Sequence, residues 1–212
     1  MESIAVIGTG SAGMQHLRVL RQQPGIHPIA IPKRPERIAQ LEAEGFLVAR
    51  TLRQARDLGA CFGIVASDTG QHLRDGLAAV EEGWDLLVEK PMAMNANDAG
   101  QLWEEGKRAG RKIYVGCTLR FSETLNLFRR HLASIGSIHT VHVECESYLP
   151  DWRPSRPYRA SYSARAAEGG VLRDLIHEID YVGWIFGWPS AVYARIRNLG
   201  RLDISSEEIC HL

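Results

Sequence analysis

A glycine-rich turn near the N-terminus has the residue types and spacing of a phosphate-binding loop. Three glycines form the pattern G-x-G-x-x-G after an apolar run at residues 4–7 and before an amphipathic stretch. The first glycine permits the tight turn, the second lets the backbone approach a pyrophosphate, and the third lets helix and strand pack closely. The helix N-terminus offers N–H groups to that anion. The turn therefore predicts a dinucleotide site, with a purely structural turn as the alternative. The cofactor-binding residues predicted here are Gly8, Gly10, Ser11, Ala12 and Gly13.

Two cations follow the second predicted strand, where the ribose of a dinucleotide is recognised. An NAD-binding fold usually places an acidic residue there, about 20 residues beyond the glycine turn, to bind the ribose 2′-hydroxyl. This sequence has Lys33 and Arg34 instead of a carboxylate. Cations at that position suit a 2′-phosphate, so the sequence favours NADP, with NAD as the second choice. The alternative is that both side chains belong to a solvated loop.

A second set of candidate residues ends a buried strand in the first half of the chain. Residues 84–91 read Trp-Asp-Leu-Leu-Val-Glu-Lys-Pro, which places Glu89 and Lys90 at the carboxyl end of a predicted parallel strand. Ligands of open α/β sheets bind at this end of the strands. A lysine there can donate a hydrogen bond to a substrate hydroxyl or carbonyl oxygen. Taken alone, the tripeptide is also compatible with a surface turn.

A predicted helix at residues 171–186 carries side chains suited to acid–base chemistry. At about 100° per residue, its apolar side chains gather on one side and its polar side chains on the other. The polar side chains are Asp174, His177, Glu178 and Tyr181. A carboxylate beside an imidazole can orient the ring, so Asp174 and His177 are candidate catalytic residues. The alternative is a solvated helix face on which the two residues form a chance pair.

The segment before this helix, residues 149–170, alternates basic and aromatic side chains and contains only two acidic residues. Guanidinium groups bind carboxylate or phosphate, and aromatic rings offer surface to a sugar or a base, so this arm suits an anionic substrate. The alternative is an arm that packs on the other domain or on a partner subunit. Its basic and aromatic residues are Trp152, Arg153, Arg156, Tyr158, Arg159, Tyr162 and Arg165. Substrate contacts are predicted for Trp152, Arg153 and Tyr162.

Strand and helix patterns alternate through the first half of the chain. Strands are predicted at 3–7, 28–31, 46–48, 61–65, 84–88 and 113–116. Helices are predicted at 11–22, 35–43, 52–58, 69–80 and 95–109. Such alternation is typical of a parallel sheet with helices on both faces. The predicted fold class is therefore α/β, with an N-terminal Rossmann domain, a doubly wound parallel sheet, at residues 1–119.

The pattern changes after about residue 120, where a helix at 121–133 is followed by a β-rich run at 138–148. After the arm and the helix at 171–186, another strand is predicted at 191–198. This order indicates a second domain of the α+β type at residues 120–212. It holds few strands for an independently packed sheet, so we expect it to be partial, or shortened.

The composition excludes several classes of function. The 212 residues include 25 basic and 25 acidic side chains, a formal net charge of zero that creates no field to attract nucleic acid or an acidic membrane. The longest uncharged apolar stretch, 181–194, is too short to span a bilayer. The N-terminus has no leader pattern, so we expect a cytoplasmic protein. The four cysteines are scattered without metal-ligand spacing, so we expect neither a disulfide framework nor a metal site.

Five motifs of this chain resemble, in order and spacing, the pattern of the Gfo/Idh/MocA family, named for glucose-fructose oxidoreductase, inositol dehydrogenase and a rhizopine-catabolism protein. The resemblance covers essentially the whole chain, and the ordered set is far more specific than any single motif. The motifs are the glycine turn extended to His16, Ser67-Asp68-Thr69 followed by His72, Glu89-Lys90-Pro91, Leu119-Arg120-Phe121, and residues 169–180.

The resemblance implies hydride transfer between a nicotinamide and a secondary hydroxyl or keto group of a sugar, cyclitol or nucleotide sugar. It implies that Lys90 touches the reacting oxygen, and that Asp174 and His177 orient the substrate and move the proton, so we expect these three to converge on one pocket. It also implies a homodimer or homotetramer formed through the sheet of the second domain. The resemblance adds Ser67, His72, Glu89 and Lys90 to the predicted cofactor site and Arg120 to the substrate site.

Several departures from the family pattern keep a rival hypothesis open. Asp174 and His177 are three residues apart, whereas many relatives space them four apart. Asp68 replaces a frequent proline, and Lys33 replaces the usual acid. Family chains usually continue well beyond this length. The rival is a shortened non-catalytic dinucleotide-binding paralogue that acts as a sensor or partner protein. A weaker alternative is a reductase for a non-sugar imine or tetrapyrrole.

Overall fold

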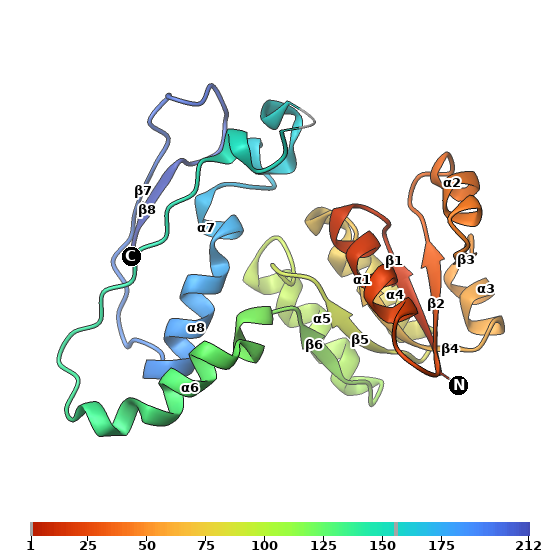
Figure 1. Cartoon of the computed structure of the whole chain (residues 1–212), viewed down its shortest axis with the longest axis horizontal. Helices are drawn as coiled ribbons and strands as arrows, with labels where there is room; N and C mark the ends of the chain where they lie inside the picture. Colours follow the sequence, from red (N-terminus) through yellow and green to blue (C-terminus); the bar gives the residue numbers. More distant parts are fainter. Residues whose placement is uncertain (1, 155–156) are drawn as a thin grey trace. The chain divides into compact units, whose positions relative to one another are not determined.

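The computed structural model describes residues 2–154 and 157–212. The chain divides into two compact units, Met1–Gly116 and Cys117–Leu212, called unit 1 and unit 2 below (Figure 1). The sequence places this boundary at residue 119. Arg156, one of the basic residues of the arm at 149–170, lies outside the described residues.

Unit 1 is built on a six-stranded parallel sheet. Its strands are β1 (Glu2–Ile7), β2 (Ile26–Ile31), β3 (Leu47–Val48), β4 (Ala60–Val65), β5 (Asp85–Val88) and β6 (Ile113–Val115). Their order across the sheet is β3-β2-β1-β4-β5-β6, and each neighbouring pair is parallel. This is the strand order of a doubly wound dinucleotide-binding sheet, so the predicted Rossmann fold is confirmed.

Helices connect the strands of unit 1. They are α1 (Ser11–Arg21), α2 (Arg37–Ala43), α3 (Leu52–Asp57), α4 (His72–Glu81) and α5 (Ala96–Arg108), with a 3-10 turn η1 (Thr69–Gln71) before α4. Two of the helices begin at a capping side chain: the Thr51 hydroxyl accepts from Gln54 N–H at 3.1 Å, and the Asn95 amide oxygen accepts from Asp98 N–H at 2.9 Å. These caps satisfy N–H groups that the first helical turn leaves unpaired.

Successive residues of strand β1 face two separate cores. Ala5 and Ile7 belong to a core that includes residues of α3, α4 and α5, whereas Val6 belongs to a core that includes residues of α1 and α2. Because successive strand residues point to opposite faces, one strand supplies both cores. Apolar residues on both faces explain why the strands read as continuous apolar runs rather than as alternating ones.

Unit 2 combines short helical segments with one small sheet. Its α-helices are α6 (Glu123–His131), α7 (Val171–Asp174) and α8 (Ile176–Phe186). Its 3-10 turns are η2 (Thr118–Phe121), η3 (Leu132–Ile135), η4 (Leu149–Asp151), η5 (Tyr158–Ala160) and η6 (Tyr162–Ala164). Strands β7 (Arg195–Arg197) and β8 (Ile209–His211) pair antiparallel. The predicted second domain of mixed α and β structure is therefore present.

The helix predicted at 171–186 is interrupted. It is divided at Leu175, whose backbone angles are φ −98° and ψ 28°, so Asp174 ends α7 and His177 lies in the first turn of α8. No glycine or proline marks the break, so the sequence pattern predicts one continuous helix. The N-terminal end of α7 is held by Glu207, whose backbone oxygen accepts from Val171 N–H at 3.2 Å and whose carboxylate accepts from Leu172 N–H at 3.4 Å.

The β-rich run predicted at 138–148 is not a strand. These residues have no regular secondary structure in this chain, and most of their side chains are exposed. The strand predicted at 191–198 is reduced to β7. Strand-forming side chains alone do not make a strand, because the backbone needs a hydrogen-bonded neighbour, and within the described residues of unit 2 only β7 and β8 pair.

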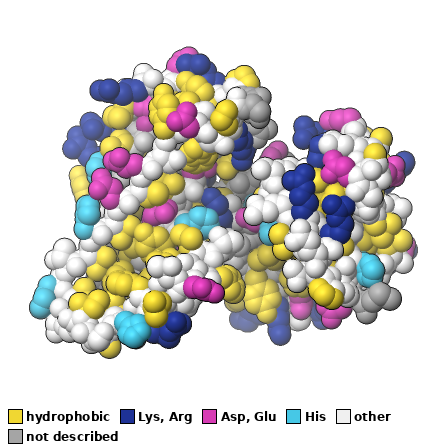
Figure 2. All heavy atoms as spheres, viewed as in Figure 1, with side chains coloured by type: hydrophobic (Ala, Val, Ile, Leu, Met, Phe, Trp, Pro, Cys, Tyr) yellow, Lys and Arg dark blue, Asp and Glu magenta, His cyan; other side chains and the backbone are white. Residues whose placement is uncertain are grey.

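Unit 2 exposes many large apolar side chains, visible in Figure 2 as yellow areas around α6 and α8. They include Phe121, Leu127, Ile138, Val141, Val143, Trp188, Val192 and Tyr193.

No helix in the described part of the chain is long and apolar enough to cross a membrane.

Candidate functional site

The glycine turn after β1 combines one open position with two crowded ones. Gly8 has φ +92°, and a Cβ there would lie 2.6 Å from the Cα of Ser67. A Cβ on Gly13 would collide with the carbonyl oxygen of Gly8. A Cβ on Gly10 would meet nothing within 4 Å. Gly8 and Gly13 are therefore required by the packing of the turn itself, whereas Gly10 borders open space.

Helix α1 begins at this open position. Gly10 is its N-cap, with no side-chain cap, and its carbonyl accepts from Met14 N–H at 2.9 Å. The N–H groups of the first turn therefore have no side chain competing for them, and the helix dipole favours an anion there. Open space at Gly10 beside uncapped N–H groups fits the pyrophosphate of a dinucleotide, which is the group that the motif predicts. The predicted contacts from Ser11 and Ala12 would come from this first turn.

Lys33, predicted to face a 2′-phosphate, is paired with a buried acid. Its ammonium lies 2.6 Å from the Asp75 carboxylate, and the side chains are 37% and 4% exposed, respectively. The hydroxyl of Ser67 donates to the other oxygen of Asp75 at 2.7 Å. Ser67 and Lys33, both predicted to bind the cofactor, are thus joined through one carboxylate of α4. The sequence pattern did not single out Asp75.

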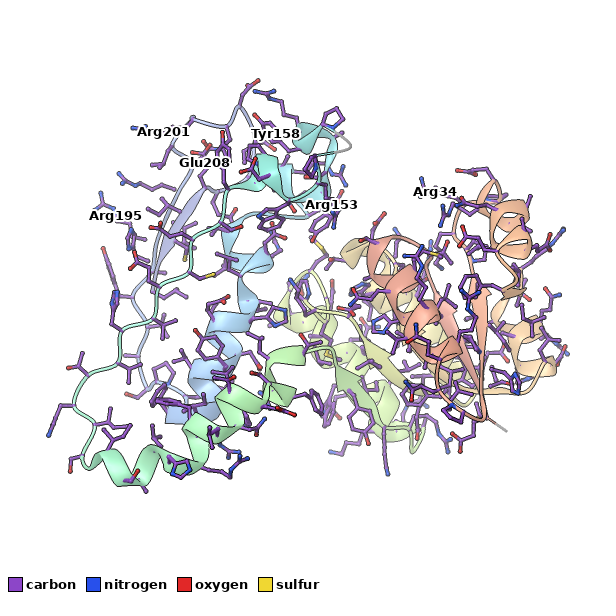
Figure 3. All side chains as sticks on the ribbon, viewed as in Figure 1. Arg34, Arg153, Tyr158, Arg195, Arg201 and Glu208 are labelled. Atoms are coloured by element: carbon purple, nitrogen blue, oxygen red, sulfur yellow. The ribbon has the colours of Figure 1, made fainter. Side chains whose placement is uncertain are left out.

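Two arginines lie near the same end of the sheet. Arg34 is exposed at the surface beside α2 (Figure 3). Arg37, in the first turn of α2, donates to the carbonyl of Thr9 inside the glycine turn at 3.3 Å. Sequence reasoning missed Arg37 because its spacing relates it only to the following helix. Its contact with the turn comes from the fold, since the end of β2 lies beside the end of β1.

Glu89 is held by a histidine of α1. His16 Nε2 lies 2.6 Å from one carboxylate oxygen of Glu89, and Lys90 N–H donates to the other at 3.2 Å. Burial by itself raises the pKa of Glu89, but the hydrogen bond and charge of His16, with the N–H and charge of Lys90, outweigh burial and lower this pKa. The ionised Glu89 carboxylate therefore links the end of β5 to α1. Lys90 begins the turn that follows this strand end.

His72 is buried at the start of α4, with an exposed fraction of 1%. Its Nδ1 lies 3.0 Å from the carbonyl oxygen of Pro91, and its Nε2 lies 2.9 Å from the carbonyl oxygen of Ser67. Both ring nitrogens therefore contact backbone oxygens of the loops that follow β4 and β5. In this geometry His72 fixes the two loops relative to each other, a supporting role for the predicted cofactor site.

In unit 2, three predicted residues come together: Tyr162 of η6, Asp174 of α7 and Arg153. Burial raises the pKa of Tyr162, and the Asp174 carboxylate, which is also its hydrogen-bond partner, raises it further against smaller opposing effects of Ser163 and Arg153. The phenol is thus neutral and serves as a donor to Asp174. A phenol, a carboxylate and a guanidinium together can bind hydroxyl and carboxylate groups of a ligand.

Two adjoining hollows lie beside this cluster. The first is lined by Leu149, Trp152, Arg153, Pro157, Tyr158, Ser161 and Ser163. The second shares Leu149, Trp152 and Ser163 with the first and adds Asp174, Glu207 and Glu208 among others. Figure 3 labels Arg153 and Tyr158 of the first hollow and Glu208 of the second. Trp152 thus borders both hollows, and Arg153 and Asp174 each border one.

Glu208 serves the backbone more than the hollow. Its carboxylate accepts from the N–H groups of Leu199, Arg201 and Leu202 at 2.8, 3.1 and 2.8 Å. Burial raises the pKa of Glu208, but these three N–H donors and the charge of Arg201 outweigh it and lower this pKa. The ionised carboxylate orders the loop that precedes β8.

Arg120 and two acidic residues of α8 have partners within unit 2. The Arg120 guanidinium donates two hydrogen bonds to the Asp180 carboxylate, at 2.9 and 2.7 Å, and these bonds raise the pKa of Arg120. Burial raises the pKa of the Cys145 thiol, and the charge of and hydrogen bond to Glu178 raise it further. Glu178 therefore faces the irregular segment rather than a solvated surface. His177 is partly buried.

In the described part of the chain, no three histidine, cysteine, aspartate or glutamate side chains gather in a way that could hold a metal ion.

Comparison with known proteins identifies both halves of the chain. Residues 3–117 match the family model for the oxidoreductase family with an NAD-binding Rossmann fold, and residues 132–211 match the model for the GFO/IDH/MocA C-terminal domain. The first match alone spans more than half of the chain.

Two curated relatives illustrate the range of the similarity. A 2,7-anhydro-N-acetylneuraminate hydratase of Mediterraneibacter gnavus is 27% identical over 186 residues, which cover 86% of this chain and 49% of the relative. An inositol 2-dehydrogenase of Acidiphilium cryptum is 27% identical over 190 residues, covering 86% of this chain and 53% of the relative. The chain thus spans about half the length of the curated relatives it matches.

Two solved structures share the fold. The WlbA dehydrogenase from Bordetella pertussis, in complex with NADH and UDP-GlcNAcA, aligns with a TM-score of 0.83 at 22% identity, over 99% of this chain and 64% of that one. GenD2 from gentamicin A biosynthesis, in complex with NAD, aligns with a TM-score of 0.79 at 22% identity, over 99% and 60%. With both domain models matched and the glycine turn in place, the chain belongs to the Gfo/Idh/MocA oxidoreductase family.

Proposed function

We propose that this chain is an NAD(P)-dependent dehydrogenase or reductase. It would transfer a hydride between a nicotinamide and a secondary hydroxyl or keto group of a sugar, cyclitol or nucleotide-sugar derivative. The observation that carries the proposal is the open space at Gly10, beside the uncapped start of α1. In a Rossmann fold this space suits a pyrophosphate. The bound nicotinamide supplies or accepts the hydride, and the residues of the chain hold the substrate and move the proton.

Three residues are proposed to be catalytic. Lys90 follows β5 at the end of the sheet where ligands of α/β folds bind, and its turn is anchored through Glu89 and His72. In this role its ammonium donates to the reacting oxygen and stabilises negative charge there. Asp174 and His177 are proposed to orient the substrate hydroxyl and to exchange its proton. Their support is the family resemblance, together with the acidic and phenolic cluster around Asp174.

NADP is proposed as the preferred cofactor, and Arg34 as the residue that favours it. Arg34 is exposed directly after Lys33, beyond the carboxyl end of β2. A guanidinium binds phosphate through paired hydrogen bonds. Lys33 contributes less positive charge than its position predicts, because Asp75 balances it. The NAD-binding family model and the NAD and NADH complexes of similar structures make NAD the second candidate.

The proposed substrate is an acidic sugar derivative. Arg153 and Trp152 border the hollow beside Tyr162 and Asp174, and this combination suits a carboxylate attached to a sugar ring. Two similar proteins point the same way: one is named for an anhydro form of N-acetylneuraminate, and another was solved with UDP-GlcNAcA. Arg120, already bound to Asp180, is proposed to contact substrate only through its remaining N–H groups.

A net hydration is the second candidate reaction. The observation that favours it is the 27% identity to a protein named as a hydratase. In that case the substrate would change without a lasting change in the amount of reduced nicotinamide.

The test is an assay of the purified protein with NADPH or NADH and a panel of keto-sugars, inositols and nucleotide-sugar acids. The nicotinamide absorbance and the products, by mass spectrometry, are followed together. Consumption of NADPH with formation of a reduced sugar is the expected result. Product formation without net consumption favours hydration. Cofactor binding without any product contradicts the enzymatic proposal and favours the non-catalytic paralogue.

We also propose that the chain assembles as a homodimer or homotetramer through unit 2. The support is the row of exposed apolar side chains on the irregular segment and near β7, which include Ile138, Val141, Val143, Val192 and Tyr193. Light scattering coupled to size-exclusion chromatography tests this: a monomer at micromolar concentration contradicts it. The cytoplasmic location stays a prediction.

A further inference from the structure

The pair formed by Lys33 and Asp75 lies at the position where the adenosine ribose of a dinucleotide is recognised. Lys33 follows β2, and Ser67 follows β4, so the two strands that flank β1 each contribute a residue bound to Asp75. Asp75 thus connects the two sides of the glycine turn. It lies in the first turn of α4, where the helix dipole favours a carboxylate.

The buried Asp75 carboxylate needs a nearby counter-ion. The Asp75 side chain is 4% exposed, and a buried carboxylate without a cation is strongly unfavourable. Arg74 is a weaker partner, because its guanidinium is 3.5 Å from Asp75 and its side chain is 70% exposed. The short contact of 2.6 Å therefore identifies Lys33 as the main counter-ion.

Pairing changes what Lys33 can offer a ligand. A free ammonium at the end of β2 would attract the two charges of a 2′-phosphate, whereas an ammonium balanced by a carboxylate forms a nearly neutral pair. An ammonium has three N–H donors, and the contact with Asp75 requires one of them. Lys33 can therefore still donate to a neutral ribose hydroxyl while exerting less attraction on a phosphate.

We propose that Asp75 is a positioning residue that sets the balance between NAD(H) and NADP(H). By holding Lys33 and cancelling its charge, Asp75 limits the preference for NADPH that Lys33 and Arg34 would together produce. This inference rests on the proposed function, since it concerns the ribose end of the same cofactor site. It assigns Asp75 no contact with the cofactor.

The test measures dissociation constants for NADH and NADPH by nicotinamide fluorescence. Asp75→Asn, which keeps the shape and can still accept the Ser67 hydroxyl, is expected to shift the ratio of the two constants toward NADPH by about tenfold, the effect of one charge-assisted hydrogen bond. Asp75→Ser makes the same charge change and is expected to give the same shift. Asp57→Asn is the matched control: it removes an exposed carboxylate just before β4, at the opposite end of the sheet, and is expected to leave the ratio unchanged.

The double variant Lys33→Met/Asp75→Asn removes both charges and is expected to return the ratio to within about threefold of wild type, because the net charge at the site is restored. A purely structural role for Asp75 would weaken both cofactors equally. An unchanged ratio in the Asp75 variants, with both cofactors still bound, overturns the inference. If the wild type binds neither cofactor, the proposed function fails and the inference fails with it.

Discussion

At the scale of single residues, Lys90 is the clearest test of the proposed chemistry. Lys90→Met removes the ammonium while keeping an unbranched side chain. Because the ammonium is proposed to act on the substrate oxygen, turnover should fall by a factor on the order of 100, with cofactor affinity within a few-fold of wild type. Steady-state kinetics with NADPH and nicotinamide fluorescence titration measure the two effects separately.

Lys107→Met is the matched control, because Lys107 is exposed in the last turn of α5. It should leave turnover and cofactor affinity unchanged. A Lys90→Met variant with wild-type turnover would contradict the catalytic role of Lys90. Equal losses of turnover and cofactor affinity would instead place Lys90 in the cofactor site alone.

Arg34 is the residue through which the predicted cofactor preference can be tested. Wild type is expected to bind NADPH at least tenfold more tightly than NADH, a difference of about 1.4 kcal/mol. Arg34→Asp should weaken NADPH binding and leave NADH binding nearly unchanged, because its carboxylate repels a 2′-phosphate. Arg53→Asp, which makes the same change on the exposed surface of α3, is the control. Equal dissociation constants of NADPH and NADH for wild type would contradict the preference. If Arg34→Asp weakens the binding of both cofactors to the same extent, Arg34 supports the fold.

The lowered pKa of Glu89 predicts how the stability of the fold depends on pH. Its pKa is lower in the folded protein than the ordinary value of 4.5, so its ionised form stabilises the fold above that pH. This contribution should disappear as the pH falls through the lowered pKa of the folded state. The difference in unfolding free energy between wild type and Glu89→Gln should therefore be largest near neutral pH and shrink toward zero in acid. Urea unfolding at several pH values measures it.

The control for this prediction is Glu42→Gln, which changes an exposed glutamate of α2. It should show little difference from wild type at any of these pH values. A Glu89→Gln difference that stays constant across the acid range would show that the carboxylate charge is not what stabilises the pair with His16.

At the scale of elements, the glycine turn predicts opposite outcomes for two similar substitutions. Gly13→Ala places a methyl group against the Gly8 carbonyl oxygen, so α1 must move away from β1, and we expect a loss of roughly 2–4 kcal/mol in unfolding free energy. Gly10→Ala adds the same methyl group into open space and should change stability by less than about 1 kcal/mol. Urea unfolding compares them, and similar losses in both variants contradict the account of the turn.

The elements of unit 1 could be predicted from the sequence because each has a local signal. Apolar strands alternate with amphipathic helices, and the Rossmann order follows from that alternation. The errors lie in unit 2. The break at Leu175 has no glycine or proline to mark it. Within the residues that the structure describes, the β-rich run at 138–148 pairs with no strand. Both depend on tertiary contacts, which a periodicity does not contain.

At the scale of the whole molecule, the sequence located the candidate residues better than their partners. Glu89, Lys90 and Ser67 could be placed because they follow strands, and strand ends share one edge of a sheet. Two other predicted residues have carboxylate partners far away along the chain. Lys33 pairs with Asp75 and Arg120 pairs with Asp180, at separations of 42 and 60 residues. No spacing rule links such residues, so only the folded chain reveals that two predicted ligand-binding cations have carboxylate partners.

A single titration tests whether this chain binds a nicotinamide dinucleotide over Gly10. NADPH is titrated into wild type and Gly10→Val, with thermal unfolding recorded for both. Gly10 has φ −72°, and a Cβ at this position would have no atom within 4 Å, so valine should leave the melting temperature nearly unchanged while it blocks the pyrophosphate. We predict saturable NADPH binding by wild type and none by the variant. Normal binding by a stable Gly10→Val protein would contradict the claim and leave the glycine turn a structural feature only.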